Sequence, residues 1–305
     1  MKTLKLGMVG GGQGAFIGGV HRMASRLDGR WELVAGALSS HPARAEASAK
    51  ELGLDPKRSY QSYAEMAVQE AARADGIDAV AIVTPNHMHA GPAIAFLEAG
   101  IHVICDKPLA ATSEQAQLID AAVRASKAHF ILTHNYTGYP VIRQARKLVE
   151  NGELGEIRVI QAEYAQDWLS QAADNKQADW RVNPEKSGAG AIGDIGTHAL
   201  NLASFVSGLQ PQALCADLHS FVDGRRVDDN AHIMLRFEKG AKGMLWASQV
   251  AVGCENTLTI RIYGEKAGLE WQQENPNQLS FTRFGQAKQL LTRGGAGFGE
   301  TAGDW

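Results

Sequence analysis

The chain has 305 residues, of which 45% are hydrophobic and 21% are charged, and its formal net charge is −3. This length accommodates about two domains, and the composition is that of a globular protein rather than a disordered or fibrous one. The lysines and arginines are scattered along the chain, which excludes the strongly basic surface that nucleic acids and anionic membranes require. We therefore expect a small polar molecule as the binding partner.

The cysteines, Cys105, Cys215 and Cys254, are odd in number and show no CxxC spacing, so they indicate reduced thiols. The N-terminal residues enter a strand without the long apolar core of a signal peptide, and no apolar stretch reaches the length of a membrane span. These features predict a cytoplasmic protein with no membrane partner.

Residues 4–9 form an apolar run that predicts a strand, and a glycine-rich turn and a helical pattern through residue 27 follow it. Such a turn binds a dinucleotide pyrophosphate, because glycines allow close backbone approach and the first helical N–H groups attract phosphate. Gly10 and Gly12 take the first two fingerprint positions, with Gln13 beside them. The third position is irregular, since Ala15 stands there and Gly18 is the glycine nearest the helix start. The alternative is a merely flexible turn.

The second predicted strand, residues 31–38, ends where an acidic residue commonly accepts hydrogen bonds from the adenosine ribose of NAD. That acid is missing here, because the loop carries Ser39 and Ser40, and Arg44 enters the next helix. These groups fit a 2′-phosphate, so the sequence is compatible with NAD and with NADP. The alternative is that the serines only cap the helix.

Helical patterns at 43–52, 62–74, 92–99 and 113–126 alternate with strand patterns at 79–83, 101–105 and 130–132. This alternation predicts an α/β fold with a doubly wound parallel sheet, a Rossmann NAD(P)-binding domain over residues 1–136. The turn after the strand at 79–83 contributes candidate cofactor-binding residues, namely Thr84, Pro85, Asn86 and His89.

The strand that begins at Ile101 stops at Asp106, Lys107 and Pro108. Ligands of open α/β sheets bind outside the carboxyl ends of the strands, so we expect Lys107 to face a cleft, with Pro108 fixing the backbone after it. We take Lys107 as the chemical centre. The alternative is an ordinary solvated loop lysine.

Past a helix at residues 141–150 the pattern changes to strands, at 157–164, 213–222, 231–237, 243–250, 258–263 and 269–272. They predict an α+β domain over residues 137–305 with one large, mostly antiparallel open sheet. Several strands are apolar on both faces, so we expect helices on one face and a second subunit on the other, in a homodimer or homotetramer.

The glycine-rich segment at 188–208 contains Asp194 at a predicted helix start and His198 four residues later. Residues at this spacing share a helix face, and an imidazole near a carboxylate is suited to general acid–base work. The alternative is a helix cap and a packed histidine. A metal site is a weaker interpretation, because His87, His89, His134 and His198 show no HExxH or CxxC spacing.

Over nearly its whole length the chain resembles the family of glucose-fructose oxidoreductase, inositol dehydrogenase and rhizopine-catabolism proteins (Gfo/Idh/MocA). The resemblance rests on the early glycine turn, on TPNHMH at 84–89, HVICDKPL at 102–109 and GDIGTH at 193–198. It implies that Lys107, Asp194 and His198 form the catalytic group. The family's motif glutamate is Asp106 here, a shorter acid, at a position implied to lie by the nicotinamide.

Other segments are similar to the sugar-contacting loops of levoglucosan-dehydrogenase-like members. They imply substrate contacts from Asn135, Tyr136, Gln166, Trp180 and Arg181, beside Lys107, Asp194 and His198. Members of the family usually continue with a further helix past the glycine-rich end at 294–305. We therefore expect a C-terminal end that is short for the family and disordered.

Together these features predict an NAD(P)-dependent oxidoreductase acting on a secondary alcohol of a sugar, anhydrosugar or cyclitol. His198 would take the hydroxyl proton, Asp194 would orient it, and Lys107 would stabilise the developing alkoxide. An NAD-retaining glycoside hydrolase is an alternative, and it would show no net change in nicotinamide absorbance during turnover. A non-catalytic nucleotide-sensing protein is another, against which the lysine, aspartate and histidine argue.

Overall fold

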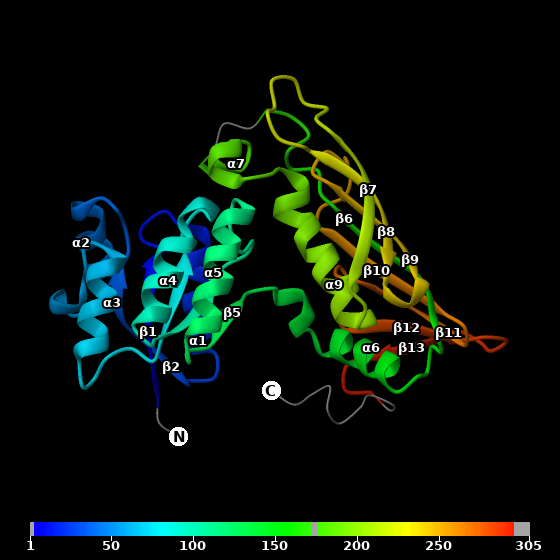
Figure 1. Ribbon diagram of the computed structural model, residues 1–305, viewed down its shortest axis with the longest axis horizontal. Coiled ribbons are helices and arrows are strands. Elements are labelled where there is room, and N and C mark those ends of the chain that lie inside the picture. Colours follow the sequence, from blue (N-terminus) through cyan, green and yellow to red (C-terminus); the bar gives the residue numbers. More distant parts are fainter. Residues whose placement is uncertain (1–2, 173–175, 296–305) are drawn as a thin grey trace. The chain divides into compact units, whose positions relative to one another are not determined.

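The computed structural model describes residues 3–172 and 176–295, and the chain divides into two compact units, Met1–Thr133 and His134–Trp305 (Figure 1). No helix among the described residues is both long and apolar enough to cross a bilayer. The predicted C-terminal end at 296–305 lies outside the described residues.

The first unit is a parallel five-stranded sheet in the order β2-β1-β3-β4-β5. Its strands are β1 (Leu4–Gly10), β2 (Trp31–Ala37), β3 (Ala79–Val83), β4 (His102–Cys105) and β5 (Phe130–Leu132). Its helices are α1 (Phe16–Arg26), α2 (Pro42–Glu51), α3 (Tyr63–Ala72), α4 (Ala90–Glu98) and α5 (Ser113–Ala125).

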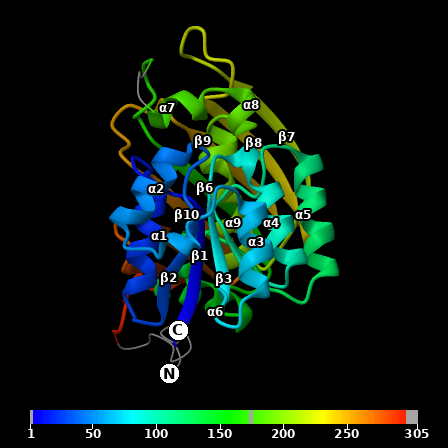
Figure 2. The ribbon, with the colours of Figure 1, turned by 90° about the vertical axis from the view of Figure 1, so that its left-hand side faces the viewer.

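Alternate residues of β3 pack into separate cores on the two faces of this sheet. Val80 and Ile82 belong to a cluster with Met66 of α3 and Phe96 of α4. Ala79 and Ala81 belong to a second cluster, which Ala49 of α2 joins. Figure 2 shows α1 and α2 on one side of the strands and α3, α4 and α5 on the other. The predicted doubly wound parallel sheet is therefore confirmed.

The second unit contains an eight-stranded sheet in the order β13-β12-β11-β10-β6-β9-β8-β7. Its strands are β6 (Ile157–Ala165), β7 (Pro211–His219), β8 (Asn230–Phe237), β9 (Lys242–Ser248), β10 (Thr257–Gly264), β11 (Ala267–Gln272), β12 (Gln278–Arg283) and β13 (Gln289–Thr292). Its helices are α6 (Pro140–Glu150), α7 (Lys176–Arg181), α8 (Pro184–Ser187) and α9 (Thr197–Ser207).

This sheet is mostly antiparallel, as predicted, and β6 and β9 pair in parallel at its centre. The sequence did not predict β12 and β13. Both strands are short and carry few β-branched residues, so their local pattern is weak, and they form by pairing with β11 and with each other.

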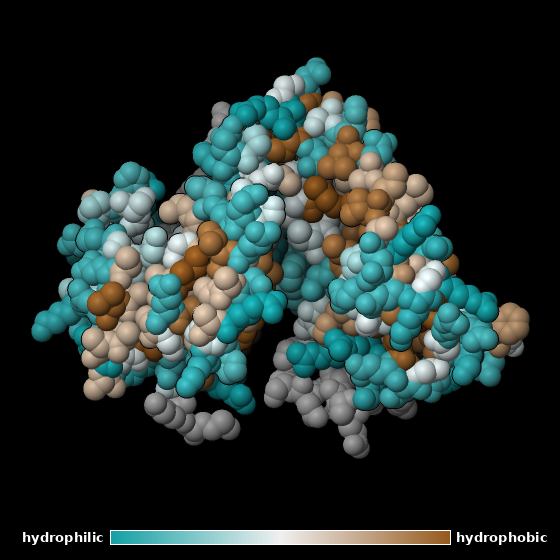
Figure 3. Space-filling model, viewed as in Figure 1, coloured by the Kyte–Doolittle hydropathy of each residue, from teal (hydrophilic) through white to brown (hydrophobic). Residues whose placement is uncertain are grey.

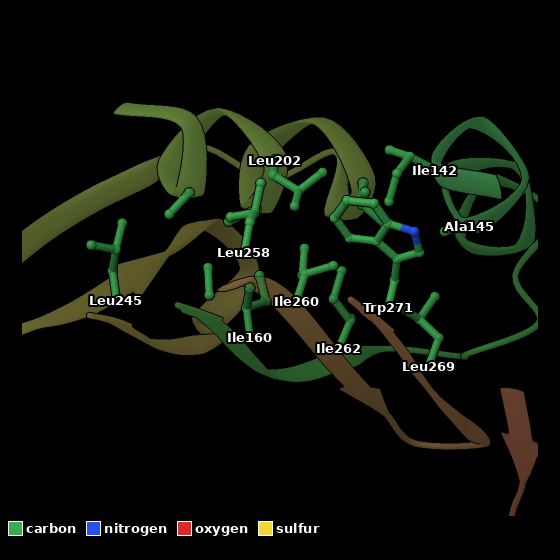
Figure 4. Close-up of a cluster of buried hydrophobic side chains, with 14 of the residues drawn as sticks. Ile142, Ala145, Ile160, Leu202, Leu245, Leu258, Ile260, Ile262, Leu269 and Trp271 are labelled. Atoms are coloured by element: carbon green, nitrogen blue, oxygen red, sulfur yellow. The ribbon is translucent and has the colours of Figure 1, made fainter. Parts of the chain in front are cut away.

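Helices α6 and α9 cover one face of the sheet and bury its largest core. Figure 4 shows Ile160, Leu258 and Ile260 pointing toward Leu202 of α9, and Trp271 lying beside Ile142 of α6. Trp271 is only 1% exposed. This core holds α9, and with it His198, in place over the strands.

The predicted single helix from residue 194 to 207 is wrong in one respect. Ile192–Gly196 is a turn of π-helix, and the α-helix α9 begins only at Thr197. Two glycines in this turn, Gly193 and Gly196, lower its preference for a regular α-helix. Asp194 thus lies in the π-turn and His198 in α9, so a regular α-helical turn does not separate them.

The opposite face of the sheet mixes apolar and charged residues. Met234 and Met244 are directly paired across β8 and β9, and both are exposed. Arg261 forms ion pairs with Glu163 and Glu270 on the same face. Figure 3, which views the sheet nearly edge-on, shows hydrophobic and hydrophilic residues interspersed over the side turned toward the viewer. A second subunit on this face stays a prediction.

Candidate active site

The glycine turn after β1 is shaped for close approach of a ligand to its backbone. Gly10 and Gly11 have φ of +80° and +73°, which other residues rarely adopt. A Cβ on Gly12 would lie 2.7 Å from the carbonyl oxygen of Leu38, and one on Gly18 would lie 2.5 Å from Cα of Gly11. Gly18 therefore allows the close helix contact that the third fingerprint glycine provides elsewhere. Ala15, the N-cap of α1, makes no side-chain hydrogen bond to the first N–H groups of the helix. Because such N–H groups bind phosphate, the turn fits a dinucleotide pyrophosphate.

The loop between β2 and α2 does not cap its helix with serine. The N-cap is His41, which makes no side-chain cap. Ser39 Oγ instead accepts a hydrogen bond from the backbone N–H of His41 at 3.1 Å. Ser40 and Arg44 are exposed. Gln13, from the glycine turn after β1, donates its backbone N–H to Ser48 Oγ and its side-chain amide to Glu51, both in α2.

His89 braces the turns that follow β3 and β4. It is 0% exposed, and its Nδ1 and Nε2 atoms each lie 2.9 Å from a carbonyl oxygen, of Pro108 and of Thr84 respectively. Burial lowers the pKa of His89, while the two carbonyl oxygens act in the opposite direction. Pro85 is half-buried and Asn86 is buried in the same turn. His89 thus holds the backbone next to Lys107.

Asp106 and half-buried Lys107 directly follow β4, at the carboxyl end of the sheet. Asp106 Oδ1 accepts a hydrogen bond of 2.7 Å from Thr133 Oγ1 and lies 3.8 Å from Nε2 of His21. Burial raises the pKa of Asp106, but the neighbouring His21, the hydrogen bond from Thr133 and the charge of Lys107 outweigh it, so the pKa lies below its usual value. Sequence reasoning missed His21 and Thr133 as partners of this acid.

In the second unit His198 lies in a buried cluster of rings. It is 5% exposed, and its ring makes edge contacts with Tyr136, at a centroid distance of 4.9 Å, and with His134, at 5.4 Å. Asp194 Oδ2 accepts hydrogen bonds from Arg181 Nε at 3.1 Å and from Gln249 Nε2 at 3.0 Å. Two donors on one oxygen hold the carboxylate in place.

The π-turn that carries Asp194 is clamped from a distant loop. Asp228 accepts the backbone N–H groups of Gly190 and Ile192 at 2.8 and 2.7 Å, one on each carboxylate oxygen. A Cβ on Gly190 would lie 1.7 Å from the carbonyl oxygen of Asp228, so only glycine fits there. Asp228 is therefore a positioning residue that sequence reasoning missed, because no local pattern links residues 38 positions apart.

The predicted substrate-binding residues of this unit differ in their surroundings. Tyr136 is half-buried and Asn135, its neighbour, is exposed. The Arg181 guanidinium lies over the ring of Trp180, 4.3 Å from the ring centroid. Gln166 donates to Asn256 Oδ1 at 2.7 Å. These residues and the His198 cluster all belong to the second unit, whereas Lys107 and the cofactor-binding candidates belong to the first.

Two family descriptions match the chain. Residues 4–136 match an oxidoreductase family with an NAD-binding Rossmann fold, and residues 142–270 match the GFO/IDH/MocA C-terminal domain. The levoglucosan dehydrogenase of Pseudarthrobacter phenanthrenivorans is 31% identical over 303 residues, which is 92% of this chain and 76% of that protein. The chain belongs to the Gfo/Idh/MocA family.

Solved structures of this family match almost the whole chain. An oxidoreductase from Sinorhizobium meliloti is 56% identical, covers 99% of this chain and 81% of its own, and has a TM-score of 0.91. An inositol dehydrogenase homolog from Azotobacter vinelandii, solved with NADH and myo-inositol, is 39% identical, covers 99% of this chain and 78% of its own, and also has a TM-score of 0.91. This Gfo/Idh/MocA protein is thus an oxidoreductase with an NAD-binding domain.

Acid–base chemistry is the chemistry that these side chains offer. Among the described residues no three histidine, cysteine, aspartate or glutamate side chains gather as they would around a metal ion. The second unit places the His198 imidazole in a buried cluster of rings, with the Asp194 carboxylate in the adjoining π-turn. In the first unit, the Lys107 ammonium group follows β4 and the glycine turn follows β1, so both lie at the carboxyl end of the parallel sheet.

Proposed function

We propose that this Gfo/Idh/MocA protein oxidises a secondary alcohol of a sugar, anhydrosugar or cyclitol with NAD or NADP. The observation that carries the proposal is that His198 is buried at the start of α9, while Arg181 and Gln249 hold the Asp194 carboxylate in the π-turn just before it. Relatives whose names or titles include levoglucosan and myo-inositol support the substrate class.

Each side chain has a separate role in this proposal. His198 takes the proton of the reacting hydroxyl, and Asp194 stabilises the imidazolium that results. Lys107 stabilises the alkoxide that develops on the same oxygen. A bound nicotinamide cofactor would supply the acceptor for the hydride that leaves the carbon. The backbone of the turn at Gly10 and Gly12 would hold the pyrophosphate, and Gly18 lets α1 pack closely against Gly11.

A screen of polyols and sugars with NAD⁺ and with NADP⁺ tests the proposal. Growth of the reduced-nicotinamide absorbance with at least one cyclitol or anhydrosugar is expected. Levoglucosan and myo-inositol are the first probes, and each is run without protein as a control. If glycosides are cleaved while that absorbance never changes, the protein is a cofactor-retaining hydrolase and the dehydrogenase assignment is wrong.

A further inference from the structure

We propose that Tyr164 and Asn256 lock the phenol of Tyr136 as a hydrogen-bond acceptor, so that the site selects a substrate with a second, non-reacting hydroxyl. The inference rests on the proposed function and adds that one non-reacting hydroxyl of the substrate must donate a hydrogen bond to Tyr136. It follows from the direction of a chain of hydrogen bonds that ends beside His198.

This series of hydrogen bonds begins at the indole of Trp168, whose N–H can only donate a hydrogen bond. Trp168 Nε1 lies 3.0 Å from the amide oxygen of Gln166. The amide nitrogen of Gln166 must then face Asn256, 2.7 Å away. That nitrogen needs an acceptor, so the oxygen of the Asn256 amide points toward it. An amide oxygen accepts and never donates.

The same oxygen of Asn256 also receives the hydroxyl of Tyr164, at 2.7 Å. Tyr164 is 3% exposed, and burial together with neighbouring Tyr136 and Asp194 raises its pKa, so the hydroxyl keeps its hydrogen. A phenol carries a single hydrogen, and Asn256 takes it. In the 2.6 Å contact between Tyr164 and Tyr136, the hydroxyl of Tyr136 is therefore the donor.

Tyr136 is left with lone pairs only, on a ring in edge contact with His198. A substrate group at Tyr136 must consequently donate a hydrogen, as a hydroxyl does and a carbonyl, ether or fluorine does not. The hydrogen of the reacting hydroxyl goes to His198 in the proposed reaction. The hydrogen that Tyr136 accepts must then come from another hydroxyl of the same molecule.

Calorimetric binding with NADH present tests this without relying on turnover. The probes are myo-inositol, levoglucosan and the monodeoxy and monodeoxyfluoro analogues of each. At one position the deoxy and fluoro analogues should both bind at least about tenfold more weakly than the parent polyol, and about equally, because fluorine cannot donate. A fluoro analogue that binds like the parent at every position would overturn the inference.

Variants test whether the direction of the Tyr136–Tyr164 hydrogen bond, rather than the packing of the two rings, sets the preference between the analogues. Tyr164→Phe and Asn256→Leu free the hydrogen of Tyr136, so the fluoro analogue should now bind better than the deoxy analogue. Asn256→Asp keeps an acceptor for Tyr164 and should retain the wild-type preference. Thr257→Val removes a nearby hydrogen bond to Glu274 that is not part of this hydrogen-bond series, and it should leave the preference between the analogues unchanged. An unchanged preference in both Tyr164→Phe and Asn256→Leu contradicts the inference.

Polyol binding without turnover contradicts only the dehydrogenase proposal, whereas a lack of any polyol binding overturns the inference itself.

Discussion

Substitution of Lys107 or of His198 should impair catalysis without impairing cofactor binding. Lys107→Ala and His198→Ala should each lower turnover by orders of magnitude and leave NADH affinity nearly intact, because neither is proposed to hold the pyrophosphate. The double variant should lose far less than the product of the single losses, since groups acting on one oxygen are not additive. Steady-state kinetics and NADH titration measure both effects.

The same variants expose the alternative roles of these residues. If His198 is only a packed core residue, His198→Ala will lower the melting temperature while turnover per folded molecule is preserved. Full turnover of a folded Lys107→Ala protein would make Lys107 an ordinary solvated lysine. Circular dichroism is the control for folding.

Asp106 should make stability depend on pH. Folding lowers the pKa of Asp106, so the ionised carboxylate stabilises the folded state at pH values above the ordinary aspartate pKa. This stabilisation is lost as the pH falls through the folded-state pKa. Thr133→Val removes the 2.7 Å hydrogen bond and should cost about 1.5 kcal/mol at neutral pH. Urea unfolding at several pH values should show this loss shrinking in acid. Thr133→Ser is the control, and a loss that stays constant with pH would contradict the account.

At the scale of elements, the loop between β2 and α2 should decide the choice of cofactor. Ser39 stands where an acid would repel a 2′-phosphate. The dissociation constant of NADP should therefore exceed that of NAD by no more than about tenfold, or roughly 1.4 kcal/mol. Ser39→Asp can keep the bond to the His41 N–H and should weaken NADP selectively. Titration calorimetry with both cofactors decides. A wild-type gap of several powers of ten in favour of NAD would reject this prediction.

The π-turn depends on its clamp. Asp228→Ala leaves the N–H groups of Gly190 and Ile192 without their carboxylate, which should cost about 1–3 kcal/mol of stability and lower kcat through Asp194. Asp223→Ala, on an exposed residue of the same loop, is the matched control. Chemical unfolding and kinetics measure the two effects. Equal behaviour of the two variants would show that the clamp has no role.

For the whole molecule, we predict a homodimer or homotetramer that buries the outer sheet face. Met234 is 66% exposed and Met244 is 48% exposed, side by side in the sheet. Burial of such residues between subunits is favourable. Light scattering at micromolar concentration should show an oligomer that Met234→Glu weakens. Met23→Glu, on exposed Met23 in α1, is the control. A monomeric wild type would contradict the prediction.

The sequence by itself determined the elements and their class. Apolar runs, glycine turns and helical periods are local, so β1 to β5, the Rossmann sheet and the large second sheet could be predicted. The motifs around Lys107 and His198 were recognisable for the same reason, because each lies within a few neighbouring residues. The contact of Gly18 with Gly11, by contrast, was not predicted, because Gly18 stands at an irregular position of the fingerprint.

Tertiary structure alone decided how the side chains are held. Asp194 meets Gln249, Asp106 meets Thr133, and Asp228 clamps the π-turn, each across many residues. The direction of the hydrogen bonds from Trp168 to Tyr136 likewise requires five side chains from three segments, around residue 136, at 164–168 and at 256. No local period specifies such contacts, because they form only when packing of the sheet and helices brings distant segments within hydrogen-bond distance.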